Sequence, residues 1–252
     1  MRLLSVEGLS KSFGGVVAAA DVSFSLEAGL LLAVIGPNGA GKSTIFNMLG
    51  GQLRPDRGRI VLGGTDITGL PPRRIWRLGV GRTFQIAQTF LSMSVIENVQ
   101  MALLSLARRT RAAWPDTRGL YHEEARQLLA RVGVEAEARR PMSELAYGDV
   151  KRVELAIALA SAPKLLLMDE PTAGMAAGER AQLMRLIASI ARERGIGVLF
   201  TEHDMDAVFD HADAVLVLVR GEIIARGRPA EVRADPVVRQ VYLGRAATLP
   251  KP

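Results

Sequence analysis

A run of nine residues, Gly36-Pro37-Asn38-Gly39-Ala40-Gly41-Lys42-Ser43-Thr44, has the spacing of a phosphate-binding loop. Because glycines carry no side chain, the backbone can wrap closely round phosphate groups. Successive backbone N–H groups and the N-terminus of the next helix supply positive potential. Lys42 can reach the β- and γ-phosphates, and the Ser43 hydroxyl can bind magnesium. We expect a nucleotide to contact Asn38, Gly39, Ala40, Gly41, Lys42, Ser43 and Thr44.

Two adjacent carboxylates, Asp169 and Glu170, follow the apolar run Leu165–Met168. Ligands of α/β proteins bind at the carboxyl ends of the strands, where this pair would lie. Asp169 can then hold magnesium through water, and Glu170 can act as the general base that polarises the attacking water. A solvated strand end would explain an isolated pair equally well, but the phosphate-binding loop upstream favours the catalytic interpretation.

Two further polar residues are candidates because of where they stand. His203 is one of three histidines and follows the expected strand Val198–Thr201. A lone histidine is more often structural than catalytic, but a position at a strand end makes His203 a candidate contact for the γ-phosphate. Gln85 follows Arg82-Thr83-Phe84, and it is a candidate site residue only if the phosphate site exists.

Strands and helices must alternate to bring these residues together. Leu30–Ile35 is continuously apolar, as in a strand covered on both faces, and Lys42–Leu49 has the pattern of a helix. Leu3–Glu7 and Val22–Leu26 partly alternate, which is typical of half-buried strands. Further strands are expected at Leu165–Met168, Gly197–Phe200 and Ala214–Val219, and a helix at Leu183, Leu186, Ile187 and Ile190. The pattern predicts an α/β fold with a mainly parallel sheet.

The middle of the chain differs, because its apolar spacing from about residue 86 to about residue 162 is helical. We therefore expect a single domain, 1–252, in which an α/β core (approximately 1–85 and 163–230) contains an inserted helical subdomain (approximately 86–162). Residues 231–252 are expected to form a C-terminal helix and tail. Within the insertion, Ala107–Leu120 contains four arginines and is expected to be exposed.

Composition excludes several kinds of site. Of the 252 residues, 48% are hydrophobic and 23% charged, which suits a substantial core with a normally charged surface. The chain has no cysteine, which excludes disulfides, thiolate metal sites and cysteine nucleophiles. The formal charge of +6 is spread along the chain, so a solvated basic surface is favoured over a polyanion site. The N-terminus has no signal-peptide pattern and no apolar run reaches ~20 residues, so a membrane role would need a membrane-embedded partner.

In this order, the motifs resemble those of the ATP-binding-cassette (ABC) ATPase family over nearly the whole chain. Gly36–Thr44 matches the Walker A loop, and Asp169 and Glu170 end the Walker B strand. Leu145-Ala146-Tyr147-Gly148-Asp149 stands where the family signature, typically LSGGQ, belongs, and a helix is expected after it at Val150–Leu159. The other matches are Phe13 with the aromatic residue that stacks on adenine, Gln85 with the Q-loop, Ala173–Ala176 with the D-loop and His203 with the switch histidine.

The resemblance implies a P-loop NTPase (RecA-like) core with an N-terminal antiparallel β region. It implies ATP and Mg²⁺ as cofactors, with hydrolysis assigned to Glu170, His203, Gln85 and Lys42 and magnesium binding to Ser43, Gln85 and Asp169. Two ATPase subunits, identical or different, would pack head to tail. Each ATP would then lie between the P-loop of one subunit and Ala146, Tyr147 and Gly148 of the other.

The same resemblance implies transport partners and a place in the cell. Transmembrane permease subunits would contact the Q-loop and the helical subdomain, and a periplasmic-type solute-binding protein would act indirectly. The chain would then be peripheral, on the cytoplasmic face of the inner membrane, and no nucleic acid would be involved.

A finer resemblance is to the ATPases of branched-chain amino acid importers, in particular the subunit with the longer insertion. It rests on Gly81–Gln85, Ser94–Val99, the tyrosine of the signature and the ending Val241–Gly244. Relatives of those importers take up other amides, ureas and aromatic acids, so the solute stays open.

Three positions depart from the family pattern: Ala146 replaces the signature serine, Asp149 the usual glutamine or glutamate, and Ala176 the Asp or Asn of the D-loop. Ala146 and Ala176 belong to the face that would complete the partner's ATP site. In a heteromeric pair, this chain would therefore offer its partner a weaker site while its own Walker residues stay intact.

Two other readings remain within the ABC family. The first is the ATPase of a lipid or lipopolysaccharide exporter, which has a similar length. The second is a non-transport ATPase that acts on ribosomes or DNA, but such proteins usually carry paired cassettes or a long coiled coil, and this chain shows no sustained heptads. A P-loop kinase would explain neither the signature region nor His203.

Overall fold

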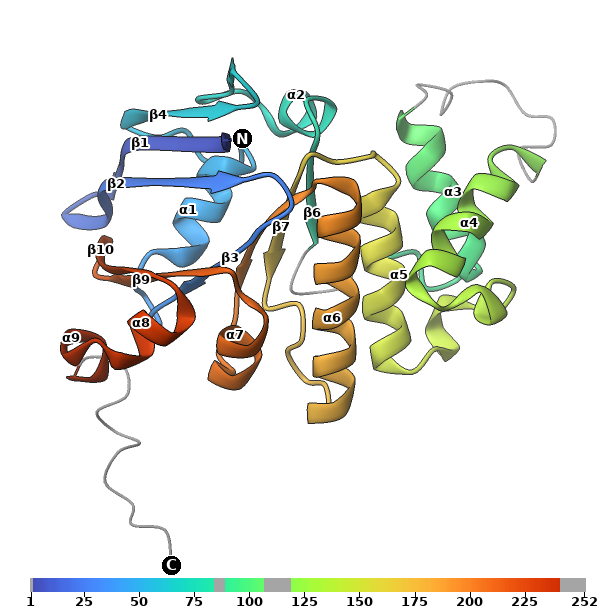
Figure 1. Cartoon of the computed structure of the whole chain (residues 1–252). Coiled ribbons are helices and arrows are strands. Elements are labelled where there is room, and N and C mark those ends of the chain that lie inside the picture. The colour runs from blue at the N-terminus through green and yellow to red at the C-terminus, as the bar shows by residue number, and fades with distance from the viewer. Residues whose placement is uncertain (1, 84–88, 107–118, 241–252) are drawn as a thin grey trace, which may run out of the picture.

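The computed structural model describes residues 2–83, 89–106 and 119–240, which form two sheets with helices around them (Figure 1). The N-terminal sheet has four strands in the order β2-β1-β4-β5, and its neighbouring pairs are antiparallel. These strands are β1 (Arg2–Phe13), β2 (Val16–Glu27), β4 (Arg57–Leu62) and β5 (Thr65–Asp66). In β2 the apolar side chains of Val22, Phe24 and Leu26 are buried and alternate with more exposed serines, because only one face of this sheet covers the core.

The central sheet has six strands in the order β10-β9-β3-β8-β7-β6. The strands from β9 to β6 are parallel, and β10 is antiparallel to β9. Their bounds are β3 (Leu31–Ile35), β6 (Val80–Thr83), β7 (Leu165–Asp169), β8 (Gly197–Thr201), β9 (Ala214–Val219) and β10 (Glu222–Gly227). β3 is covered on both faces, since Leu31 and Ala33 belong to different hydrophobic clusters from Leu32 and Val34.

Helices cover both faces of the central sheet (Figure 1). They are α1 (Lys42–Leu49), α2 (Pro72–Arg77), α3 (Val95–Leu106), α4 (His122–Val132), α5 (Tyr147–Leu159), α6 (Ala177–Arg194), α7 (Met205–His211), α8 (Pro229–Ala234) and α9 (Pro236–Val238). Ile45 and Phe46 of α1 share a buried cluster with Leu4 and Val6 of β1, so α1 fills the space between the two sheets. Within the described ranges, no helix is both long and apolar enough to span a bilayer.

Helices α3, α4 and α5 contact one another and form a group at one side of the molecule (Figure 1). They lie between β6 and β7 in the chain, where the sequence analysis expects a helical subdomain. The subdomain limits near residues 86 and 162 stay a prediction, and most of Ala107–Leu120 lies outside the described residues.

Two helices differ in detail from the sequence prediction. The helix after the signature was expected at Val150–Leu159, but it begins at Tyr147, because the Ala146 carbonyl already accepts the N–H groups of Asp149 and Val150 at 3.0 Å. Within the described residues, two short helices, α8 and α9, lie where one C-terminal helix was expected from about residue 231. They are separate because Pro236 has no N–H to continue α8, and the Asp235 carboxylate caps α9.

Candidate nucleotide site

A cavity of about 240 Å³ lies at the carboxyl ends of the central parallel strands. Its walls come from the phosphate-binding loop, the end of β7, the loop after β8 and the start of β2. Its lining residues are Val16, Val17, Ala18, Asn38, Gly39, Ala40, Gly41, Lys42, Ser43, Thr44, Asp169, Glu170 and His203. The fold therefore brings together the loop, the acidic pair and the histidine, which are up to 167 positions apart in the chain (203 − 36 = 167).

The loop that precedes α1 is shaped by close backbone contacts. Gly41 has φ 104°, a conformation that favours glycine, and a methyl group there would collide with the carbonyl oxygen of Ala18. The Gly221 N–H donates to the carbonyl of Ala40 at 2.9 Å. The loop is thus held between β2 on one side and the β9–β10 turn on the other, which leaves its N–H groups in place for an anion.

Lys42 is the first residue of α1, and its side chain reaches back to the start of the loop. Its Nζ donates to the carbonyl oxygens of Gly36 at 2.7 Å and Pro37 at 3.1 Å. Burial lowers the pKa of the Lys42 ammonium, and the negative charges of Glu170 and Asp169 offset part of that effect. An anionic ligand here would relieve the cost of this buried positive charge.

The acidic pair is held by the neighbouring strand. Thr201 at the end of β8 donates its hydroxyl to Asp169 Oδ1 at 2.7 Å, and the Glu170 N–H donates to Thr201 Oγ1 at 3.1 Å. Glu170 has φ 49°, which is rare for a residue with a side chain. His203 Nε2 lies 2.7 Å from Glu170 Oε1, so the candidate general base and the switch histidine are in direct contact.

The structure separates other predicted site residues from this cavity. Phe13 is 47% exposed at the end of β1, and the described lining residues include its hairpin neighbours Val16 and Val17 but not Phe13 itself. Ala146, Tyr147 and Gly148 lie at the start of α5 and likewise do not belong to the described lining of the cavity. Gln85 lies outside the described residues.

Sequence reasoning missed four contributors. Val16, Val17 and Ala18 form a wall of the cavity, and Thr201 binds the Asp169 carboxylate and the Glu170 backbone N–H. The wall of Val16, Val17 and Ala18 carries no sequence motif. Thr201 could have been named as a site residue, because it ends a predicted strand and the acidic pair ends another.

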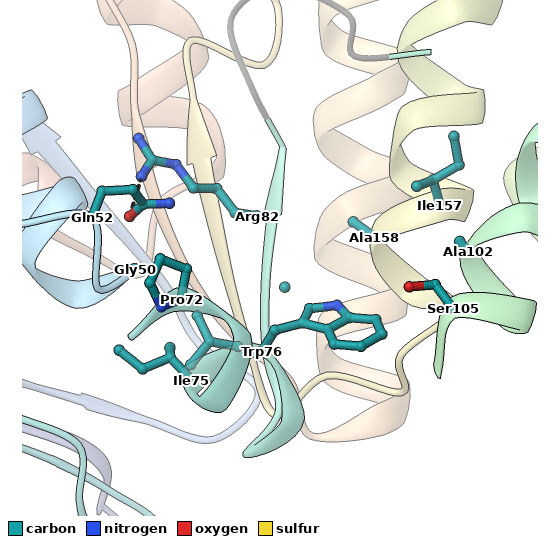
Figure 2. Close-up of a pocket in the computed structure, with 12 residues that line it drawn as sticks. Gly50, Gln52, Pro72, Ile75, Trp76, Arg82, Ala102, Ser105, Ile157 and Ala158 are labelled. Atoms are coloured by element: carbon teal, nitrogen blue, oxygen red, sulfur yellow. Dashed lines mark hydrogen bonds between the residues drawn. The ribbon is translucent and has the colours of Figure 1, made fainter. Parts of the chain in front are cut away.

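A second cavity, of about 290 Å³, lies between α2 on one side and α3 and α5 on the other. Trp76 extends from α2 across it toward Ala102 and Ser105 of α3, and Ile157 and Ala158 line the α5 side (Figure 2). We call this cavity the α2–α5 groove.

Polar residues lie at one end of the α2–α5 groove (Figure 2). Arg82 Nη1 donates to Gln52 Oε1 at 2.9 Å. Burial lowers the pKa of Arg82, and the charge of Asp169 counteracts that shift, so Arg82 is electrostatically linked to the nucleotide cavity.

Comparison with known proteins places this geometry in a family. The sequence model of the family "ABC transporter" matches residues 19–173, more than half of the chain. The chain belongs to the ABC transporter family, and it is an ATP-binding cassette that hydrolyses ATP. A second model, described as "Branched-chain amino acid ATP-binding cassette transporter", matches residues 222–248.

Individual relatives cover almost the full length. The high-affinity branched-chain amino acid transport ATP-binding protein LivG of Salmonella typhimurium is 39% identical over 97% of this chain and 98% of its own. The lipopolysaccharide export system ATP-binding protein LptB of Acidithiobacillus ferridurans is 38% identical over 96% of this chain and 97% of its own. The ADP conformation of MJ1267, an ATP-binding cassette of an ABC transporter, has a TM-score of 0.87 and 32% identity over 97% of this chain and 99% of that one.

These comparisons confirm the family expected from the motifs, the P-loop NTPase fold class and the ATPase activity.

Proposed function

We propose that this chain is one of the ATPase subunits of an importer for branched-chain or related amino acids. The observation that carries the proposal is the match of residues 222–248 to the branched-chain amino acid cassette model, supported by the full-length likeness to LivG. In this proposal the chain is peripheral at the cytoplasmic face of the inner membrane, where it binds transmembrane permeases. A periplasmic-type solute-binding protein delivers the solute to those permeases.

We propose the following roles for the residues of the cavity. The loop N–H groups and Lys42 hold the phosphates, and Glu170 takes the proton of the attacking water. His203, in contact with Glu170, holds that carboxylate and meets the γ-phosphate. Ser43 and Asp169 offer a hydroxyl and a carboxylate oxygen to the same cavity, which are ligands that suit Mg²⁺. A bound Mg²⁺ would neutralise phosphate charge, and Gln85 is proposed as a further ligand of it.

The adenine and the second half of the site are expected outside this cavity. Phe13 lies beside the cavity on the β1–β2 hairpin and is exposed enough to stack on a base. Ala146, Tyr147 and Gly148 lie at the N-terminus of α5, where free N–H groups attract an anion. We propose that they complete the ATP site of a second ATPase subunit, identical or different.

The α2–α5 groove is the proposed contact with the permease. Its apolar lining, with an aromatic side chain reaching across it, suits an inserted helix or loop of a partner. Arg82 lines this groove, and the charge of Asp169 acts on its pKa. The groove is therefore electrostatically linked to the ATP site. The family resemblance implies a permease contact at the Q-loop and the helical subdomain, and this supports the proposal because α3 and α5 of that subdomain line the groove.

A reconstituted transporter tests the proposal. The chain is co-expressed with the permeases, second ATPase and solute-binding protein of a branched-chain amino acid importer from the same genome, and ATP hydrolysis is measured in proteoliposomes. We expect binding protein loaded with leucine, isoleucine or valine to stimulate hydrolysis and uptake, and the unloaded protein to stimulate less. Stimulation by lipopolysaccharide and by no amino acid would overturn the proposal in favour of the exporter that LptB represents.

A further inference from the structure

Four consecutive residues, Thr201 to Asp204, begin at the last residue of β8 and bind the chain from the last residue of β7 onward. Thr201 binds Asp169 and Glu170, and His203 binds Glu170. The other two residues bind positions further along the chain. Glu202 accepts hydrogen bonds from Thr172, and Asp204 forms an ion pair with Arg180 at 2.7 Å. The two segments, 169–180 and 201–204, are therefore tied at several successive points.

Glu202 is the centre of this contact, and its side chain is almost fully buried. It is 3% exposed. Its Oε1 accepts the N–H of Thr172 at 2.8 Å and the hydroxyl of Thr172 at 2.6 Å, and its Oε2 accepts the N–H of His203 at 3.3 Å. Across the described part of the chain, no ion pair joins Glu202 to a basic side chain. Burying a carboxylate without a counter-ion is costly, so these three donors must hold it.

The backbone beside this contact is strained. Glu170, two residues before Thr172, has φ 49°, and such a conformation persists only where the surroundings hold it. Thr201 holds the N-terminal side of that turn through the Glu170 N–H. Glu202 holds the C-terminal side through Thr172, and with its other oxygen it holds the backbone of His203.

We propose that Glu202 is a positioning residue for ATP hydrolysis: it clamps Thr172 and His203 to one carboxylate and so keeps the His203 imidazole against Glu170. The proposal rests on the catalytic roles proposed above for Glu170 and His203. Glu202 lies outside the described lining of the nucleotide cavity, so its loss should slow the chemical step without weakening ATP binding.

Two substitutions separate the contacts of Glu202. Glu202→Gln keeps one oxygen for Thr172 but places an NH₂ group opposite the His203 N–H, which is donor against donor. Thr172→Val removes the hydroxyl and keeps the size, whereas Thr172→Ser keeps the hydroxyl. Asp213→Asn is a matched control, because the Asp213 carboxylate also accepts a strand N–H, that of Leu31 at 2.8 Å, and it lies outside the described lining of the nucleotide cavity.

Amide hydrogen exchange of the full-length chain tests the clamp, and ATP hydrolysis by the assembled transporter tests its effect. We expect faster exchange at His203 in Glu202→Gln, faster exchange at Thr172 in Thr172→Val, and unchanged exchange in the phosphate-binding loop. Because hydrogen bonds to charged groups are lost, kcat should fall about tenfold to a hundredfold in both variants, with KM for ATP within about twofold. Thr172→Ser should restore kcat, and Asp213→Asn should lower Tm without lowering kcat.

Three results would overturn the proposal: unchanged exchange at His203 in Glu202→Gln, a rise in KM that accounts for the lost activity, or an equal loss of kcat in Asp213→Asn. The exchange measurement decides the clamp independently of catalysis. If Glu170→Gln hydrolysed ATP at the rate of the unsubstituted protein, the proposed role of Glu170 as general base would be wrong. The exchange result would still decide whether Glu202 holds Thr172 and His203.

Discussion

Lys42 is 9% exposed, and its ammonium group donates to backbone carbonyl oxygens of the phosphate-binding loop. Its pKa lies below the ordinary value of 10.5 because burial disfavours the charged form. Between the lowered pKa and 10.5, the unfolded chain binds more protons than the folded chain. The contribution of Lys42 to stability therefore rises with pH through that window, and at neutral pH the charge is a cost that favours anion binding.

Lys42→Met should make the nucleotide-free chain more stable and the nucleotide complex weaker. We expect Tm at neutral pH to rise by about 2–4 °C, which corresponds to ~1 kcal/mol for a chain of this size. Calorimetry without nucleotide and titration with a fluorescent ATP analogue measure the two effects. Lys164→Met, at an exposed lysine, is the control and should change neither. A lower Tm in Lys42→Met would show that the buried charge is not a cost.

Glu170→Gln should bind ATP with little change and hydrolyse it slowly. The amide keeps an oxygen for His203 but cannot take a proton from water, so we expect the rate to fall about a hundredfold or more. Single-turnover hydrolysis and size-exclusion chromatography with Mg²⁺ and ATP check this, since an ATP-bound dimer with the partner subunit should accumulate. Hydrolysis at the unsubstituted rate would move the general base elsewhere, with His203 the next candidate.

At the scale of elements, two helices that face the expected dimer interface lack a side-chain cap. α5 begins after Ala146 and α6 after Ala176, and neither alanine side chain can accept a hydrogen bond from the first turn. Both are positions where the family resemblance expects a polar residue. The N-terminal N–H groups of both helices thus stay available, and their dipoles still attract an anion.

Ala146→Ser should therefore have two separable effects. A serine cap stabilises a helix by about 1 kcal/mol relative to alanine, so the Tm of the isolated chain should rise. A hydroxyl facing the partner's γ-phosphate should also strengthen ATP-driven self-association in the Glu170→Gln background.

Calorimetry follows the first effect, and sedimentation with Mg²⁺ and ATP follows the second. Ala176→Ser is the comparison, because it caps α6 without adding a hydroxyl at the signature. A rise in Tm with no change in association would show that the missing hydroxyl does not limit closure of the dimer.

At the scale of the whole molecule, the α2–α5 groove and the nucleotide cavity are distinct sites, because no described residue lines both. Ile157→Glu places a charge in the apolar side of the groove and should reduce co-purification with the permeases about tenfold or more, because an unpaired buried charge is costly. Nucleotide binding should stay unchanged. Val237→Glu, at an exposed apolar residue of α9, is the control and should assemble normally. Normal assembly of Ile157→Glu would exclude the groove as the permease contact.

The isolated chain should be largely monomeric and a poor ATPase. Ala146, Tyr147 and Gly148 lie outside the described lining of the phosphate cavity, so a single copy does not complete the proposed site. Sedimentation and steady-state hydrolysis at increasing protein concentration measure this. Fast ATP hydrolysis by a homodimer would contradict the proposal that Ala146 and Ala176 weaken the ATP site that this chain completes for its partner.

Local patterns determined much of this protein from the sequence alone. The helix Lys42–Leu49 and the strand Ala214–Val219 have the predicted bounds, because apolar periodicity and glycine stops act within a few residues. The parallel sheet and the meeting of Lys42, Glu170 and His203 also followed, since strand ends in α/β folds share one edge.

Tertiary structure alone decided the contacts between segments that carry no motif. The Val16–Ala18 wall, the α2–α5 groove and the carboxylate of Glu202 between Thr172 and His203 depend on which segments the fold brings side by side. Sequence patterns report the environment of a residue along its own helix or strand, whereas these contacts depend on strand order and on which segments pack together. A buried Glu202 could not be told from a surface glutamate until the fold had covered it with Thr172.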